Sequence, residues 1–127
     1  MHTVIIGLGS NIEPQKNIQA ALVELGKHFK ILEKTPAKQT KPVGPINQPD
    51  FLNCAVLAEI DKDCTEIKTI LRTIESLLKR DRSGNPYGPR TIDLDILVWN
   101  EKIVDQDFYN RNFIREDVLR LKPDLKY

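Results

Sequence analysis

Two stretches of the chain repeat apolar residues at helical spacing. The first carries its apolar face at Ile18, Leu22, Leu25 and Phe29. The second runs over Asp63–Asp81 and fits the helical template throughout, at Ile67, Ile70, Leu71, Ile74, Leu77 and Leu78. Because residues three and four apart share one side of a helix, both stretches predict amphipathic helices. A further short helix is expected near Ile114–Leu121, in an otherwise polar tail.

Other segments are rich in the β-branched and apolar residues that favour strands. They are Thr3–Leu8, Lys30–Thr40, Phe51–Ile60 and most of Tyr87–Trp99, and a turn at residues 100–102 leads into a further short strand. Pro36 lacks the N–H that a central strand needs, so it places its segment at an edge or a bulge. The stretch "GLGSN", residues 7–11, predicts a tight turn in which Ser10 or Asn11 caps the first helix.

Proline and glycine mark two loops between these elements. Residues 41–50, "KPVGPINQPD", form the first loop, and Arg82–Pro89 form the second. The order strand, helix, two strands, helix, strand predicts an α+β sandwich, with helices packed on an antiparallel-rich sheet. Because no linker interrupts the pattern, we interpret residues 1–127 as a single domain.

Composition narrows the classes of function. The formal net charge is +1, which excludes a generic nucleic-acid binder, and 6% aromatic residues are too few for an RNA-stacking sheet. Cys54 and Cys64 lack metal-ligand spacing and are interpreted as reduced thiols, which favours the cytoplasm. No apolar segment approaches the length of a membrane span. Any anion site must therefore come from local clustering of charge.

Two carboxylates interrupt the most apolar strand, in "YGPRTIDLDILVW". Residues two apart in a strand point the same way, so Asp93 and Asp95 should project together, in line with Leu97 and Trp99. The alternate residues face a core: Ile92, Leu94, Ile96 and Val98. Paired carboxylates resist burial, and they suit either a solvated strand face or a divalent cation such as Mg²⁺ with its bound phosphates.

Four cations lie close to these acids in the sequence: Lys79, Arg80, Arg82 and Arg90. Guanidinium groups fork onto phosphate oxygens, so cations beside paired acids fit a metal-bound polyphosphate. The alternative is a basic helix C-terminus, which accounts for Lys79 and Arg80 but not for Arg90 at the start of a strand. Glu75, on the preceding helix, is expected to be an exposed glutamate.

These residues resemble a known family. "YGPRTIDLDIL" is similar to the signature of 6-hydroxymethyl-7,8-dihydropterin pyrophosphokinase, and "IGLGSNI" and "TKPVGPINQPDFLNCAV" resemble its start and its pterin-side loop and strand. The resemblance implies a ferredoxin-like α+β fold. It also implies that ATP donates its terminal pyrophosphoryl group to the pterin hydroxymethyl oxygen, that AMP is released, and that two Mg²⁺ ions take part.

The resemblance also implies roles for individual residues. Asp93 and Asp95 would hold the metal ions, and together with Arg82 and Arg90 they would form the catalytic set. The implied ATP-binding residues are Glu75, Arg80, Arg82, Tyr87, Arg90 and Arg111. The implied pterin-binding residues are Thr40, Pro42, Val43, Phe51, Asn53 and Phe113. The expected partners are these small molecules alone, and the expected state is a monomer.

The tail "DQDFYNRNFIREDVLRLKPDLKY" departs from the family pattern. Arg111 and Phe113 align with the family's arginine and stacking phenylalanine only across a deletion, and a core contact is the alternative for Phe113. The family's histidine has no counterpart, because His2 and His28 lie elsewhere. Two hypotheses therefore stand: an active pyrophosphokinase with a shortened tail, or a paralogue that binds nucleotide or pterin with little or no transfer.

Overall fold

The structure is a computed structural model, and it describes residues 1–80 and 87–127. The elements follow one another along the chain as β1 (His2–Ser10), α1 (Pro14–His28), β2 (Lys30–Lys34), β3 (Lys38–Thr40), β4 (Phe51–Ile60), α2 (Cys64–Leu77), β5 (Asp93–Trp99), β6 (Lys102–Ile103), α3 (Asp107–Asn110) and α4 (Asn112–Leu121).

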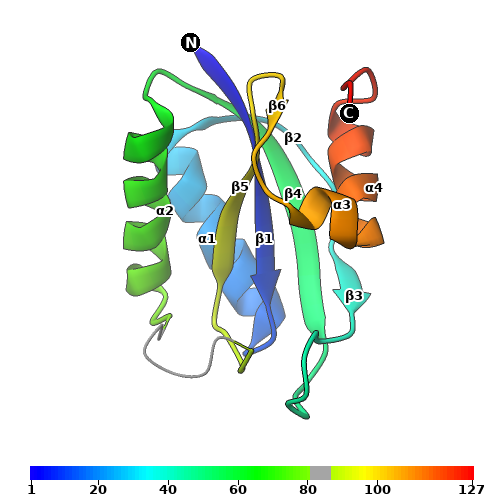
Figure 1. Cartoon of the computed structure of the whole chain (residues 1–127). Coiled ribbons are helices and arrows are strands. Elements are labelled where there is room, and N and C mark those ends of the chain that lie inside the picture. Colours follow the sequence, from blue (N-terminus) through cyan, green and yellow to red (C-terminus); the bar gives the residue numbers. More distant parts are fainter. Residues whose placement is uncertain (81–86) are drawn as a thin grey trace.

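The described strands join in one six-stranded antiparallel sheet (Figure 1). The order is β2-β4-β1-β5-β6, and the short β3 pairs with the other end of β4. A β-α-β-β-α-β succession with its first strand between the third and the last is the ferredoxin-like arrangement. The predicted α+β class, with helices packed on an antiparallel sheet, is therefore confirmed.

The two faces of the sheet are covered by different helices. Alternation along β1 sends Val4 and Ile6 into a core shared with α1 and α2, and sends Ile5 into a second core shared with α3 and α4. The shorter helical pair covers only part of its face. Gly7 and Gly9, farther along β1, leave the rest of that face as the floor of a cavity.

The stretch "GLGSN" differs from its prediction. β1 continues through Ser10, and α1 begins at Pro14 after Glu13, whose φ is 40°. Neither Ser10 nor Asn11 caps the helix, because the Asn11 side chain is engaged by the two loops at the end of the sheet. Sequence alone could not distinguish a glycine that turns the chain from one that leaves space above a strand.

Other boundaries shift for local reasons. Lys30–Thr40 forms two edge strands rather than one, with Pro36 in the break between them. Helix α2 starts after the N-cap Asp63, in a capping box with Glu66, and it ends at Leu77 rather than at residue 81. Lys79 then takes a positive φ of 65°, which turns the chain away from the helix axis.

The face alternation predicted for β5 changes near its end. The pairing of β1 with β5 shifts register at Leu97, which is an extra residue on β5. Leu97 and Val98 both pack in the second core, whereas Trp99 packs against the first. The predicted faces of Val98 and Trp99 were therefore wrong, because this β-bulge reverses the alternation.

Both cysteines are free thiols, as expected. In the described part of the chain, no helix has the length and apolar character needed to cross a membrane.

Candidate active site

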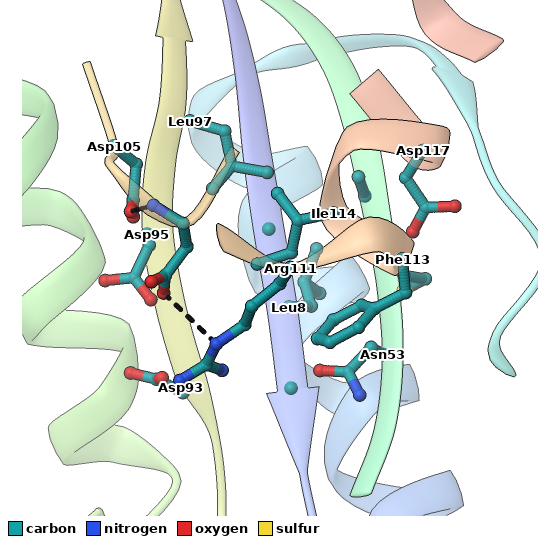
Figure 2. A pocket seen from close by; sticks show the side chains of 15 residues that line it. Leu8, Asn53, Asp93, Asp95, Leu97, Asp105, Arg111, Phe113, Ile114 and Asp117 are labelled. Atoms are coloured by element: carbon teal, nitrogen blue, oxygen red, sulfur yellow. Dashed lines mark hydrogen bonds and ion pairs between the residues drawn. The ribbon is translucent and has the colours of Figure 1, made fainter. Parts of the chain in front are cut away.

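The acidic pair lies on a floor formed by three neighbouring strands (Figure 2). In the register of the sheet, Asn53 of β4, Gly9 of β1 and Asp93 of β5 form one cross-strand row. Gly7 and Asp95 lie in the next row on the same face. A Cβ atom at Gly9 would stand 2.8 Å from Asn53 Oδ1, so this floor requires glycine. Both carboxylates line one cavity of about 50 Å³, as the alternation predicts.

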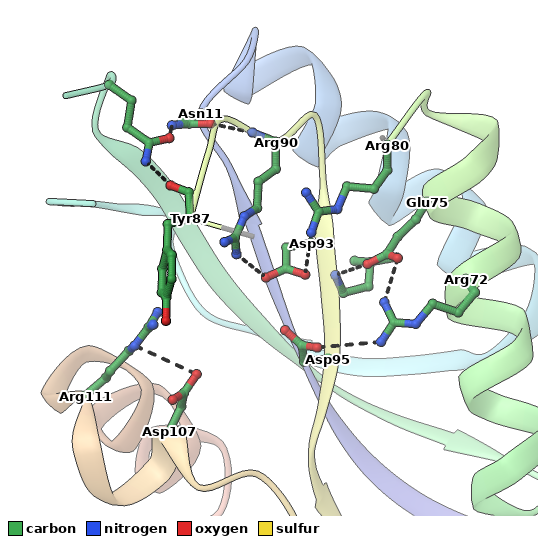
Figure 3. Close-up of polar contacts among 12 residues, drawn as sticks. Asn11, Arg72, Glu75, Arg80, Tyr87, Arg90, Asp93, Asp95, Asp107 and Arg111 are labelled. Atoms are coloured by element: carbon green, nitrogen blue, oxygen red, sulfur yellow. Dashed lines mark hydrogen bonds and ion pairs between the residues drawn. The ribbon is translucent and has the colours of Figure 1, made fainter. Parts of the chain in front are cut away.

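Each acid has its own arginine neighbours (Figure 3). Arg90 Nη1 lies 3.1 Å from Asp93 Oδ2, and Arg80 Nη2 lies 3.9 Å from Asp93 Oδ1. On the other side, Arg72 Nη2 lies 3.8 Å from Asp95 Oδ1. The sequence pointed to Arg80 and Arg90 but missed Arg72, which projects from α2 one turn before Glu75. Positive groups thus stand beside both acids.

Glu75 is buried, with 1% of its surface exposed, so the expectation of an exposed side chain was wrong. Its Oε2 accepts a hydrogen bond from the backbone N–H of Leu94 (2.8 Å), and its Oε1 accepts one from Arg72 (2.6 Å). At Leu94, β5 pairs with β1 on one side, and on the other side no strand among the described residues pairs with it. A buried N–H left without an acceptor there would be costly. Glu75 therefore supports the strand between the two acids. Its implied contact with ATP stays a prediction that this buried position does not favour.

The electrostatics of Asp95 suit a cation. Burial, followed by the charges of Asp93 and Asp105, raises the pKa of Asp95 to about 7, and Arg72 offsets only part of this effect. Asp105, just before α3, is a third acid that the sequence analysis did not single out. Carboxylates that repel one another in this way are stabilised when a divalent cation lies between them.

The donor chemistry of the pair fits Mg²⁺, which prefers carboxylate oxygens and keeps several waters. Within residues 1–80 and 87–127, no group of three or more His, Cys, Asp or Glu side chains is arranged to hold a metal ion. The protein would thus supply Asp93 and Asp95, and water and phosphate oxygens would complete the coordination.

A second cavity, of about 110 Å³, adjoins the first. Five residues of the implied pterin set line it: Thr40, Val43, Phe51, Asn53 and Phe113. Four residues of the implied ATP and catalytic sets also line it: Tyr87, Arg90, Asp93 and Arg111. Pro42 is not among the lining residues, whereas its neighbour Lys41 is. The structure therefore brings most of the predicted site residues together.

Strand pairing explains how the second cavity is built. β3 lies against β4 with Thr40 opposite Phe51, and the Asn53 amide donates a hydrogen bond to Thr40 Oγ1. The guanidinium carbon of Arg90 lies 5.7 Å from the centroid of the Phe51 ring, a cation–π distance. The cavity thus has an aromatic ring beside a positive group, and a polar amide two residues farther along the same strand.

Asn11 joins the two loops that flank this cavity, a role that its sequence context did not reveal. Its amide nitrogen donates to Gln48 Oε1 (2.8 Å) and to the Pro49 carbonyl (3.0 Å), and its Oδ1 accepts from the Arg90 N–H (2.8 Å). Gln48 in turn donates to the carbonyl of Tyr87 (Figure 3). The side chain is 5% exposed, so these bonds are well shielded from water.

The C-terminal helices complete the site despite the departure of the tail from the family pattern. Arg111 and Phe113 lie at the junction of α3 and α4 and line both cavities. Arg111 Nε stands 3.8 Å from Asp107 Oδ2. Phe113 belongs to neither described core cluster, so the alternative of a core contact does not hold. The remaining candidate, Arg82, lies outside the described residues.

Comparisons with known proteins agree with this geometry. The family model for 7,8-dihydro-6-hydroxymethylpterin-pyrophosphokinase (HPPK) matches residues 5–123. The chain is 32% identical over 134 residues to a 2-amino-4-hydroxy-6-hydroxymethyldihydropteridine pyrophosphokinase of Pseudomonas aeruginosa, covering 97% of this chain and 82% of that protein. It is 31% identical over 139 residues to the bifunctional protein FolKE of Lactococcus lactis, covering all of this chain but only 40% of the relative's length.

A solved structure shows the same fold. The HPPK-DHPS of Plasmodium falciparum, described as wild type with SDX-DHP, superposes with a TM-score of 0.57 at 14% identity, over 94% of this chain and 33% of that one. Identity this low supports the fold alone, whereas the family match spans nearly the whole chain. This chain therefore belongs to the 7,8-dihydro-6-hydroxymethylpterin-pyrophosphokinase (HPPK) family.

Proposed function

We propose that this protein transfers the terminal diphosphate group of ATP to 6-hydroxymethyl-7,8-dihydropterin, in folate biosynthesis. The pterin hydroxymethyl oxygen attacks the β-phosphorus of ATP. The bond from that phosphorus to the oxygen bridging to the α-phosphate breaks, and its electron pair leaves with AMP. The hydroxyl proton passes to solvent, and the second product is the pterin diphosphate.

The observation that carries this proposal is the junction of the two cavities. We call the acidic pair of the first cavity, Asp93 and Asp95, together with the arginines beside it, Arg72, Arg80 and Arg90, the acid end. We call the second the ring end, defined by Thr40, Val43, Phe51, Asn53 and Phe113. Asn53, Asp93, Arg111 and Phe113 line both cavities. A reaction that joins a flat heterocycle to a metal-bound polyphosphate needs this adjacency.

At the ring end, Phe51 and Phe113 offer flat apolar faces for the pterin. The Asn53 amide offers both a donor and an acceptor to the amide-like edge of the ring. Thr40 holds that amide in one orientation through its hydroxyl. Together these groups would bind the pterin and direct its hydroxymethyl arm toward Asp93.

We propose that Arg90 and Arg80 at the acid end, and Arg111 beside it, bind phosphate oxygens as the transferred group passes between donor and acceptor. Arg82 is proposed for the same role. When bound by Asp93 and Asp95, two Mg²⁺ ions would neutralise phosphate charge and align the reacting oxygens. No strong general base is needed, since position and charge neutralisation provide most of the acceleration in phosphoryl transfer.

The loops joined by Asn11 would limit access of water to the reacting phosphorus. Residues 41–50 carry Gly44, and a Cβ atom at that glycine would stand 3.2 Å from the Tyr87 side chain, so this loop packs closely against Tyr87. Such contact favours transfer to the pterin over hydrolysis of ATP.

We also propose that residues 1–127 act as a single-domain cytoplasmic monomer. One sheet includes all the described strands, and both thiols are free.

The test is AMP formation from ATP and Mg²⁺, measured with and without the hydroxymethyl-dihydropterin. Pterin-dependent AMP is the expected result. Asp61→Ala, which removes an exposed acid far from both cavities, serves as the matched control for substitutions of the acidic pair and should retain activity. ATP binding or pterin binding without any AMP would instead support the alternative hypothesis of a binding module.

A further inference from the structure

Asp117 lines the first cavity on the side opposite the acidic pair (Figure 2), and its carboxylate forms an ion pair with Lys38. Lys38 Nζ lies 3.0 Å from Asp117 Oδ1 and 3.4 Å from Glu116 Oε2. The Asp117 side chain is 4% exposed and the Lys38 side chain 35%. Neither Lys38 nor Asp117 belongs to the residues that the sequence analysis singled out.

This pair connects the two elements that carry the ring-end side chains. Lys38 of β3 lies directly opposite Asn53 of β4 in the sheet register. Asp117 follows Phe113 by four residues on α4, so the two side chains lie on the same face of that helix. Phe113, Asn53 and Asp117 all line the first cavity. The Lys38–Asp117 contact therefore spans the gap between the strand of Asn53 and the helix of Phe113.

Helix α4 has both apolar and polar contacts with its surroundings. Ile114, Val118 and Leu121 pack in or against the second core. Arg115 donates hydrogen bonds to the carbonyls of Phe108 and Tyr109, which ties α4 to α3. Among the contacts of the described residues, the ion pairs of Lys38 with Glu116 and Asp117 join α4 to β3, one helical turn after Phe113.

The energetics favour a firm connection. Burial raises the pKa of Asp117, and the hydrogen bond and charge of Lys38 counteract this effect. For Lys38, burial lowers the pKa, but the contacts with Asp117 and Glu116 outweigh it and the net direction is upward. Each group thus favours the charged form of the other, and removing one partner leaves a buried charge without its counter-ion.

We propose that Lys38 and Asp117 are positioning residues that set the spacing between Phe113 and the strand carrying Phe51 and Asn53. This inference rests on the proposed function, because it assigns the spacing to a flat ring held between these side chains. By joining β3 to α4, the ion pair would hold the Phe113 ring at a set distance from Asn53. The pair thereby tunes pterin binding without touching substrate.

The kinetic test uses Lys38→Met, which keeps the aliphatic stem and removes the charge. We expect the KM for the pterin to rise about tenfold, which corresponds to about 1.4 kcal/mol of binding free energy. The KM for ATP should stay within about twofold, since, among the described residues, the ion pairs of Lys38 reach Glu116 and Asp117 and not the arginines or acids of the acid end. Lys38→Arg, which keeps the charge, should stay close to the wild type.

Lys27→Met is the matched control. It removes an exposed ion pair, Lys27 with Glu24, of the same 3.0 Å length but on α1, where it faces neither cavity. Neither KM should change in this variant. If Lys27→Met and Lys38→Met gave the same kinetic profile, the positioning role would be refuted.

A structural readout separates positioning from loss of stability. The four phenylalanines, Phe29, Phe51, Phe108 and Phe113, can be labelled with 4-fluorophenylalanine, and Phe113→Leu assigns the resonance of interest. In Lys38→Met the fluorine signal of Phe113 should shift or broaden, while that of buried Phe108 stays unchanged.

A double variant, Lys38→Met with Asp117→Leu, guards against simple unfolding. Replacing both partners of a buried pair by apolar groups restores stability in many proteins. We expect the melting temperature to recover while the pterin KM stays raised. Recovery of the pterin KM together with the melting temperature would show a purely structural role and would overturn the proposal. If the wild type were folded but inactive, the proposed function would be refuted. The fluorine signal of Phe113 in Lys38→Met would then still test whether Lys38 sets the position of that ring.

Discussion

The acid end and the ring end of the site are built in different ways. The two acids of the acid end come from one strand, where alternation along β5 projects Asp93 and Asp95, and a buried Glu75 on α2 holds the strand between them. The ring end comes from β3, β4, a loop and α4, joined by side-chain hydrogen bonds and the Lys38–Asp117 ion pair. The comparison teaches that one strand places the two acids, whereas ring recognition depends on tertiary contacts.

The strongest way to break the acid end is Asp95→Ala. We expect pyrophosphoryl transfer to fall about 10³-fold, because the metal loses one of its two carboxylates where phosphate charge must be neutralised. The fold should survive, since Asp95 is on the cavity face rather than in the core. Turnover and circular dichroism check both points. Wild-type turnover in this variant would remove Asp95 from the mechanism.

The next effect concerns the support beneath the acids. Glu75→Ala would leave the Leu94 N–H and the Arg72 guanidinium without their buried acceptor, and should cost about 3 kcal/mol in the free energy of unfolding. Glu75→Gln keeps an acceptor for the N–H and should cost about 1 kcal/mol. Urea denaturation measures both. If both substitutions lowered the free energy of unfolding equally, Glu75 would stabilise the protein through its charge alone and not through its hydrogen bond to the strand.

At the ring end, Phe51→Ala should raise the pterin KM about tenfold through loss of the stacking face. The KM for ATP should change less, because Phe51 lines the second cavity and not the first. Tyr127→Ala, which removes an exposed aromatic ring at the end of the chain, is the control and should leave both constants unchanged. An equal loss of affinity for both substrates would contradict the division of the site into two ends.

The smallest effect is a pH dependence of stability without divalent cations. The pKa of Asp95 is raised to about 7, so between pH 4 and 7 the folded state holds a proton that the unfolded chain releases. Stability should therefore fall as pH rises through this window. The loss is about 1 kcal/mol once solvent screening of a side chain that is 41% exposed is allowed for. Asp95→Asn should make the free energy of unfolding nearly independent of pH in this window. The raised pKa of Asp95 would be contradicted if the wild type became more stable from pH 4 to 7 and Asp95→Asn abolished that rise.

Sequence reasoning predicted the fold and the acid end well because both depend on periodicity. Helical spacing identified α1 and α2, and alternation identified the cavity face at Asp93 and Asp95. It failed at Val98 and Trp99, where a single bulged residue reverses the alternation. A bulge depends on the partner strand, so a local pattern does not reveal it.

The supporting residues were harder to find because their partners are distant in sequence. Asn11 was interpreted as a helix cap, although its bonds reach Gln48 and Arg90. Arg72 carried no motif, and Glu75 was expected at the surface, although it meets a backbone N–H that only the folded sheet edge presents. Side chains that satisfy distant backbone groups leave no periodic signal.

The measurement that tests the central claim most directly is phosphorus NMR of a reaction with ATP, Mg²⁺ and the hydroxymethyl-dihydropterin. If the acid end and the ring end form one reaction site, both the β- and γ-phosphorus of ATP will appear together in a pterin diphosphate, and AMP will keep only the α-phosphorus. Formation of ADP with inorganic phosphate, at a rate that the pterin does not change, would contradict the account.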